Sequence, residues 1–201
     1  IYFHCSTNST VSNNYIYGAT NNTQEGDGDG KHGLYNRCNS GDGNIIMNNQ
    51  IFLQTDVYGC DSNTYGMGLE GSLEISGNDI YIANINSSSC DRAIGIEAYS
   101  AQVVRNNFIF VNQRERYDRW GGGLNITGES PENPAIIEDN FVMAQREARG
   151  ITSANSIVRN NIVHGGYDSL NEGISEAGHQ FIANWGYGSN DRAYNWAFYT
   201  G

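Results

Sequence analysis

The sequence predicts an all-β fold, a right-handed parallel β-helix of about seven rungs that takes up residues 1–201 as a single domain. Two observations predict this fold: an apolar segment with a central Asn recurs along the chain, and a Gly-apolar dipeptide recurs between its copies. A third is that no window of about 11 residues or more has helical periodicity. The alternative is an antiparallel β-sandwich with chance Asn repeats, and sandwiches rarely repeat one Asn per strand pair.

The recurring segment reads apolar-x-x-Asn-x-apolar. Its copies begin at intervals of 35, 29, 29, 33, 21 and 23 residues, at Val11, Ile46, Ile75, Val104, Ile137, Val158 and Phe181. The fourth position is always Asn: Asn14, Asn49, Asn78, Asn107, Asn140, Asn161 and Asn184. Because Asn tolerates the left-handed bend between strands and its amide can bond to the next rung, we expect these side chains to form a ladder, with rungs about 4.8 Å apart.

A second ladder lies between these copies. It comprises Gly33-Leu34, Gly68-Leu69, Gly95-Ile96, Gly123-Leu124, Gly150-Ile151 and Gly173-Ile174, with Ile1 and Phe198 as first and last rungs. The residue after each apolar position should point outward, because side chains alternate along a strand. The irregular spacing indicates insertions at loops, mostly before the Gly.

The charge and the apolar content of the chain argue against two classes of function, nucleic-acid binding and membrane insertion. The 201 residues include 22 Asp+Glu but only 11 Lys+Arg, and the formal net charge is −11. This balance argues against nucleic-acid binding, which needs clustered Lys and Arg. No apolar run approaches the roughly 18 residues of a membrane span, so membrane insertion is not expected.

The Val-x-Asn-Asn-x-Ile units, each followed by a Gly-Ile or Gly-Leu strand, resemble right-handed parallel β-helices of the pectate-lyase-like superfamily. The resemblance covers nearly all of residues 1–199. It implies the fold strongly and the activity weakly, because that superfamily includes lyases, hydrolases, esterases, epimerases, phage tailspikes and non-catalytic surface proteins. Two of its catalytic patterns are absent: the Asn-Thr-Asp, Asp-Asp and Gly-His-Gly set of polygalacturonases and the Asp-Pro-His-Asp of alginate epimerases.

Both ends of the chain read as the interior of a solenoid. Residues 1–4 and 196–199 resemble strands without the terminal caps that a solenoid needs. We therefore expect either an internal piece of a longer chain or a subunit that associates with itself through its ends.

Four cysteines indicate an extracellular, secreted location. Their positions on neighbouring rungs predict the disulfides Cys5–Cys38 and Cys60–Cys90, with buried free thiols as the alternative. Four sequons permit N-glycosylation, at Asn8, Asn21, Asn86 and Asn125. An Asn-rich chain contains that many by chance, so the sequons are only compatible with secretion.

The predicted register stacks Glu70 on Glu97, with their carboxylates around 5 Å apart, the separation of a retaining glycosidase. A nearby loop adds Asp118 as a third carboxylate, and we predict these three as the catalytic residues. The predicted substrate-binding residues are aromatic rings and guanidinium groups: Tyr35, Tyr99, Arg116, Arg119 and Trp120. The alternative is a solvated acidic pair beside a salt-bridged loop.

No cofactor is required by this interpretation. The alternating acids Glu25, Asp27 and Asp29, separated by Gly, form a candidate Ca²⁺ loop. They lack the full EF-hand pattern, and a mobile acidic turn is the alternative.

Two classes of function follow from the sequence. The first is an extracellular module that binds, and in one version cleaves, a polysaccharide along the Glu70/Glu97 face, as a glycoside hydrolase or polysaccharide lyase. Its net charge favours a neutral glycan. The second is a non-catalytic stalk, adhesin or filament subunit that stacks end to end.

Overall fold

A computed structural model describes most of the chain. The described residues are 1–2, 6–22, 31–36, 43–57, 64–84, 92–113, 121–146, 148–165, 170–172, 180–182 and 185–188. Within them the fold is all-β and contains no helix, which confirms the predicted fold class. No helix in this part of the chain has the length and apolar character needed to cross a membrane.

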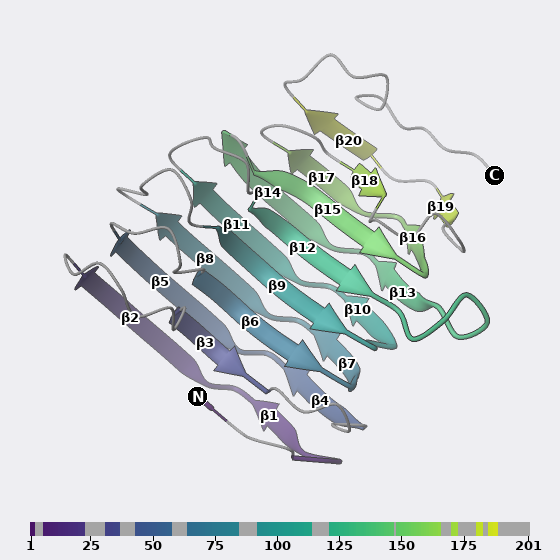
Figure 1. Ribbon diagram of the computed structural model, residues 1–201, viewed down its shortest axis with the longest axis horizontal. Coiled ribbons are helices and arrows are strands. Elements are labelled where there is room, and N and C mark those ends of the chain that lie inside the picture. The colour runs from purple at the N-terminus through teal and green to yellow at the C-terminus, as the bar shows by residue number, and fades with distance from the viewer. Residues whose placement is uncertain are drawn as a thin grey trace.

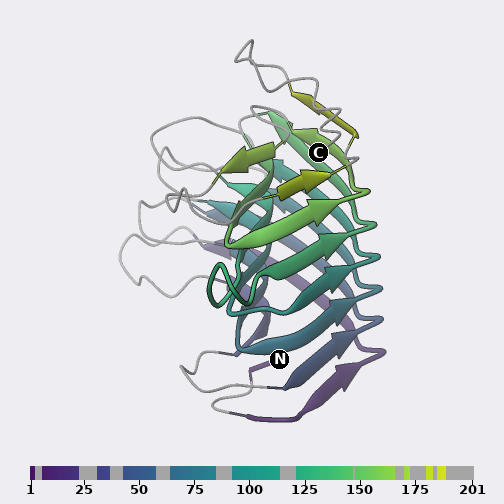
Figure 2. The ribbon, with the colours of Figure 1, turned by 90° about the vertical axis from the view of Figure 1, so that its right-hand side faces the viewer.

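Twenty described strands form three parallel sheets that wind around a common core as a solenoid (Figure 1 and Figure 2). Sheet 1 contains β3 (Lys31–Tyr35), β6 (Thr64–Glu70), β9 (Ala93–Tyr99), β12 (Gly122–Thr127), β15 (Arg149–Ala154) and β18 (Leu170–Glu172). Sheet 2 contains β1 (Thr10–Ser12), β4 (Asn44–Met47), β7 (Ser72–Ser76), β10 (Val103–Arg105), β13 (Ala135–Glu138), β16 (Ser156–Arg159) and β19 (Gln180–Ile182). Sheet 3 contains β2 (Tyr15–Asn22), β5 (Gln50–Val57), β8 (Asp79–Asn84), β11 (Phe108–Gln113), β14 (Phe141–Arg146), β17 (Ile162–Gly165) and β20 (Trp185–Gly188).

The Asn ladder lies along the edge where sheet 2 turns into sheet 3. Each Asn Nδ2 donates to Oδ1 of the next Asn at 2.9 or 3.0 Å, in the order Asn14, Asn49, Asn78, Asn107, Asn140 and Asn161. Each Oδ1 after the first also accepts the preceding Asn's backbone N–H. This confirms the predicted ladder for six of its members; Asn184 lies outside the described residues.

The bend itself belongs to a different residue from the one predicted. The left-handed backbone occurs one position before each ladder Asn, with φ between 53° and 61° at Asn13, Asn48, Gly77, Asn106, Asp139 and Asn160. These are the residue types that adopt this conformation most readily. The sequence analysis assigned both the bend and the ladder to one Asn, but two residues share these roles. The third residue of each repeat adopts the left-handed backbone, and the Asn at the fourth position forms the ladder.

Glycines set the register of sheet 1. A Cβ on Gly66 would lie 2.5 Å from the backbone oxygen of Gly95, and one on Gly95 would lie 2.5 Å from that of Gly123. The rungs approach too closely there for any other residue. The inward apolar residues that follow are aligned from strand to strand as Leu34, Met67, Ile96, Leu124 and Ile151, and the backbone of Leu170 continues this register.

The predicted second ladder was therefore wrong at two rungs. Met67 occupies the position assigned to Leu69, because β6 is shifted by two residues, and Leu69 pairs with Ala98 instead. Leu170 occupies the position assigned to Ile174. At the N-terminal end the prediction agrees with the structure, since the bridge between Tyr2 and Tyr35 aligns Ile1 with Leu34.

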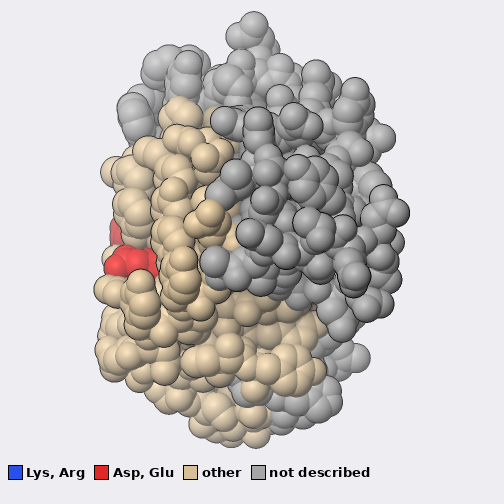
Figure 3. All heavy atoms as spheres, turned by 90° about the vertical axis from the view of Figure 1, so that its left-hand side faces the viewer, with Lys and Arg blue, Asp and Glu red and all other residues tan. Residues whose placement is uncertain are grey.

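The core is the space enclosed by the three sheets. Its fully buried side chains are mostly Ile, Leu, Val, Met and Ala, drawn from all three sheets. Each strand contributes alternate residues to it, so the remaining residues face outward. On the side shown in Figure 3, the described atoms show a small acidic patch and no basic side chain in view.

Candidate functional site

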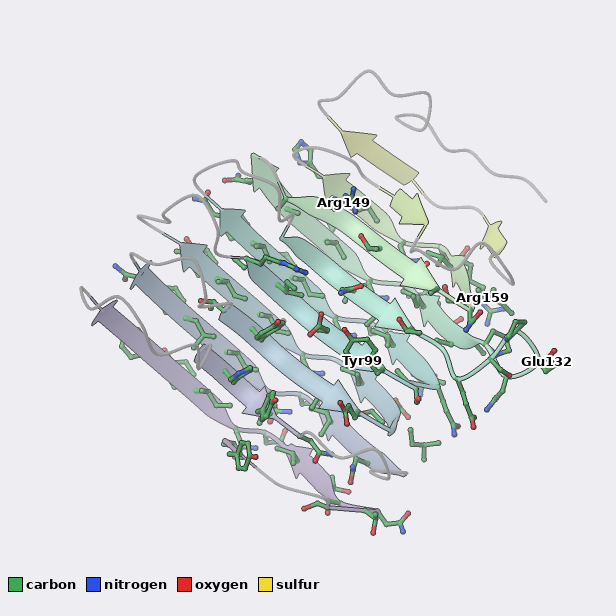
Figure 4. The ribbon with its side chains drawn as sticks, viewed as in Figure 1. Tyr99, Glu132, Arg149 and Arg159 are labelled. Atoms are coloured by element: carbon green, nitrogen blue, oxygen red, sulfur yellow. The ribbon has the colours of Figure 1, made fainter. Side chains whose placement is uncertain are left out.

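The outer face of sheet 1 carries the predicted site. Ile96 and Ala98 of β9 are fully buried in the core, whereas Glu97 and Tyr99 between and after them face outward. The face is visible in Figure 4, where Tyr99 marks β9 and Arg149 marks β15. The alternation of apolar and polar residues along β9 is enough to place these side chains.

The predicted stacking of Glu70 on Glu97 was wrong. Glu97 pairs with Gly68, and Glu70 pairs with Tyr99, so the two acids are diagonal neighbours on the same face. Their strand positions are roughly 8 Å apart, given about 4.8 Å between strands and about 3.3 Å per residue along them. The cause is the two-residue shift of β6 that Gly66 imposes.

Glu97 is the centre of a hydrogen-bonded cluster. Asn125 on β12 pairs with it directly, and Asn125 Nδ2 donates to Glu97 Oε1 at 2.9 Å. Burial raises the pKa of the Glu97 carboxyl, although hydrogen bonds from Asn125, Tyr99 and Tyr65 and the charge of Arg92 partly oppose this. A carboxyl group with a raised pKa binds a proton more readily than an exposed one.

Tyr99 complements this carboxyl group. Burial, followed by the charge of Glu97 and its hydrogen bond to Glu97, raises the pKa of Tyr99 to about 12. The phenol therefore stays protonated at neutral pH and acts as a hydrogen-bond donor. Glu97 and Tyr99 therefore form a hydrogen-bonded pair on one strand, in which the phenol donates to the carboxyl group.

Aromatic rings lie beside the carboxyl cluster. Tyr35 stacks on Tyr2 with ring centroids 5.3 Å apart, and His32 stacks on Tyr65 at 5.0 Å. His32 also contacts Tyr35, at 4.1 Å between centroids. Gly68 makes room for this group, because a Cβ there would lie 3.0 Å from Cδ2 of Tyr35. The rings thus form a continuous wall leading up to the position next to Glu97.

Some polar atoms near this face are buried without a hydrogen-bond partner among the described residues. Oε2 of Glu70 and Nε of Arg92 are two of them. A buried polar atom of this kind requires an explanation such as a water or a ligand. Glu70 ends β6 and Arg92 directly precedes β9, so these polar groups lie at opposite ends of the sheet 1 strands.

Of the remaining predicted residues, the structure describes three, and the others lie outside the described residues. Asn8 and Asn125 are described, and Asn21 is described in its backbone within β2. The nitrogen of Asn125 that would carry a glycan is the one that donates to Glu97. The other predicted sites lie outside the described residues: Asp118, Arg116, Arg119, Trp120, Glu25, Asp27, Asp29, Asn86, Cys5, Cys38, Cys60 and Cys90.

The sequence analysis missed four members of the cluster: Tyr2, His32, Tyr65 and Arg92. Three are aromatic residues on the outward side of sheet 1: Tyr2 comes directly after the predicted rung residue Ile1, His32 two residues before Leu34, and Tyr65 four residues before Leu69. Outward aromatic residues on successive rungs were therefore a usable signal. It was overlooked because only the residue after each Gly-apolar pair was considered.

Comparison with known proteins finds no family model, no curated protein and no solved structure that matches this chain. The class of protein is accordingly defined by the fold alone, as a parallel β-solenoid with an Asn ladder.

Proposed function

We propose that this chain is an extracellular β-helix module that binds a neutral polysaccharide on the outer face of sheet 1. The observation that carries the proposal is the Glu97 cluster, in which a half-buried carboxyl group, Asn125 and Tyr99 lie beside a wall of aromatic rings. The resemblance to the pectate-lyase-like superfamily supports a glycan ligand. The extracellular location rests on the cysteine spacing of the sequence, and the sequons are compatible with it.

The chemistry of a sugar matches this surface. Aromatic faces carry negative potential and attract the C–H face of a pyranose ring. Glu97 and Asn125 can accept or donate to ring hydroxyls, and the phenol oxygen of Tyr99 can accept from one. The net charge of −11 favours a neutral glycan over a polyuronate.

A catalytic version of the proposal assigns Glu97 as the general acid, because its raised pKa favours the protonated form. Glu70 then serves as the base. The diagonal placement of the two acids, whose strand positions are roughly 8 Å apart, replaces the close pair expected from the sequence. It leaves room for the water that an inverting glycosidase holds between base and sugar, where the carboxyl groups are roughly 6.5–9.5 Å apart. In this version the product has inverted configuration, which proton NMR of the fresh product detects.

Titration calorimetry with soluble neutral polysaccharides tests binding. Glu97→Gln removes the ionisable group with little change of shape, and we expect it to weaken binding at least tenfold. Glu132→Gln is the matched control, because Glu132 is exposed on the loop between β12 and β13, away from Tyr99 (Figure 4). Equal affinities of wild type and Glu97→Gln would place any glycan elsewhere.

A purely structural role is the second candidate. The continuous stacking of Asn side chains and of aromatic rings from rung to rung favours it, since such ladders stabilise a solenoid without any ligand. Analytical ultracentrifugation separates the two proposals. Concentration-dependent linear assembly together with no glycan binding supports the structural role.

A further inference from the structure

The outer face of sheet 3 contains a groove that the sheet 1 site does not use. Its volume is about 470 Å³, and its lining includes Tyr15, Gln50, Phe52, Asp79, Tyr81 and Phe108. The volume lies in the range of roughly 300–1,000 Å³ that small-molecule sites occupy.

The register explains how the hollow forms. Tyr15, Gln50, Asp79 and Phe108 follow one another on four adjacent strands at the same position. The two middle side chains are shorter than the aromatic ones at either end. The strands of Tyr15 and Phe108 are about 14 Å apart, three strand spacings of about 4.8 Å, so the gap has room for one or two pyranose rings.

A row of stacked rings forms the long side of the groove. Phe52 and Tyr81 are stacked with centroids 4.7 Å apart and planes 1° apart, and the row continues to Phe110 at 4.7 Å. These rings cover one another's faces, so they present mainly edges to the groove. They provide a rigid wall whose shape does not depend on a ligand.

The two ends of the groove present aromatic surface. Phe108 is 47% exposed, and its ring stacks on Phe141 of the following strand at 5.2 Å. Its opposite face is therefore turned toward Asp79. Tyr15 is 72% exposed at the other end. A mostly apolar hollow that is framed by exposed aromatic residues and holds a few polar groups, here Gln50 and Asp79, is typical of a binding site.

We propose that this groove is a second saccharide site, which binds one or two neutral pyranose residues between Tyr15 and Phe108. The aromatic ends take the C–H faces of the sugar, and the Gln50 amide and Asp79 carboxylate take its hydroxyls. Asp79 is the charged residue of the lining, and with the acidic chain it disfavours phosphates and uronates. The site is on another sheet from Glu97, so it does not depend on the function proposed there.

Four neutral hexasaccharides serve as probes: cellohexaose, mannohexaose, xylohexaose and laminarihexaose. Their binding to the full 201-residue chain is measured by calorimetry in a Glu97→Gln background, which weakens the contribution of the sheet 1 site. We expect one of them to bind, and Tyr15→Ala or Phe108→Ala to weaken it at least tenfold. Ile162→Ala is the matched control, because Ile162 is 46% exposed at the same position two strands beyond Phe108 and does not line the groove.

Circular dichroism melting checks that each variant is folded. The proposal is overturned if no hexasaccharide binds the Glu97→Gln protein, or if Tyr15→Ala and Phe108→Ala bind as well as Ile162→Ala. It is also overturned if Phe108→Ala dissociates a dimer, which would make a second copy of the chain the occupant. If Glu97→Gln leaves wild-type affinity unchanged while the groove variants lose it, the sheet 1 proposal fails and this one stands.

Discussion

The Asn edge between sheets 2 and 3 and the outer face of sheet 1 are built on opposite principles. Along the edge, every described rung repeats one side chain and one pair of hydrogen bonds. On the sheet 1 face, neighbouring rungs place different residues at one position: Tyr35, Gly68, Glu97, Asn125 and Thr152. Repetition at the edge holds the solenoid together, and variation on the face produces the hydrogen-bonded cluster around Glu97.

Asn107→Ala should produce the largest effect, because it interrupts the ladder at its centre. The change removes the acceptor of the Asn78 backbone N–H and of Asn78 Nδ2, and the donor to Asn140 Oδ1. Each buried group left without a partner costs about 1–3 kcal/mol, so we expect a loss of about 3–5 kcal/mol. Chemical denaturation measures it. Asn125→Ala on the sheet 1 face is the control, and an equal loss there would remove the contrast between the two regions.

Gly95→Ala tests the close approach that sets the register of sheet 1. The added methyl would overlap the Ile109 side chain and lie 2.5 Å from the Gly123 oxygen. Overpacking of this kind costs about 1–3 kcal/mol, measured as a lower denaturation midpoint. Gly122→Ala is the control, because its nearest atom would be 3.4 Å away. Similar stabilities of the two variants would show that the glycine row does not fix the register.

Glu97→Gln should change how stability depends on pH. Since burial raises the pKa of Glu97 above the ordinary 4.5, the folded chain holds this proton more tightly than the unfolded chain. Stability therefore falls as pH rises from about 4.5 through the raised native pKa, because the folded state binds more protons in that interval. We expect Glu97→Gln to lack this component of the fall in thermal melts. Parallel wild-type and variant curves across that interval would contradict it.

Arg105→Ala should have the smallest effect. Arg105 pairs with Glu74 across neighbouring strands of sheet 2 at 3.0 Å, but its side chain is 44% exposed. Exposed ion pairs contribute about 0–1 kcal/mol. Hydrogen bonds from Ser76 and Arg105 lower the pKa of Glu74, so the small contribution is present above the ordinary carboxyl pKa and lost as pH falls through the lowered value. Melting curves at neutral pH and at about pH 3 measure it, and a loss above about 2 kcal/mol would contradict this ranking.

The sequence predicted the Asn edge well because repetition there is literal. One residue type at one position in each copy is enough to infer a stack, and Asn14 to Asn161 form it. The residue before each ladder Asn carries a repeated signal of the same kind. Asn, Asp or Gly occupies it in each described copy, and this marked the bend more directly than the ladder Asn did.

What the sequence determined by itself was the kind of fold, the side of each strand that faces the core, and the residues that stack at the edge. All three follow from side-chain periodicity, which is local. Only the tertiary structure decided that Glu97 pairs with Gly68 and not with Glu70. A shift of two residues keeps every side chain on its own face, so the apolar pattern is satisfied equally by Gly66-Met67 and by Gly68-Leu69. Which of the two registers forms depends on contacts between rungs, because Gly66 fits closely against Gly95 and the core side chain of Ile80. Such contacts exist only once the chain has coiled.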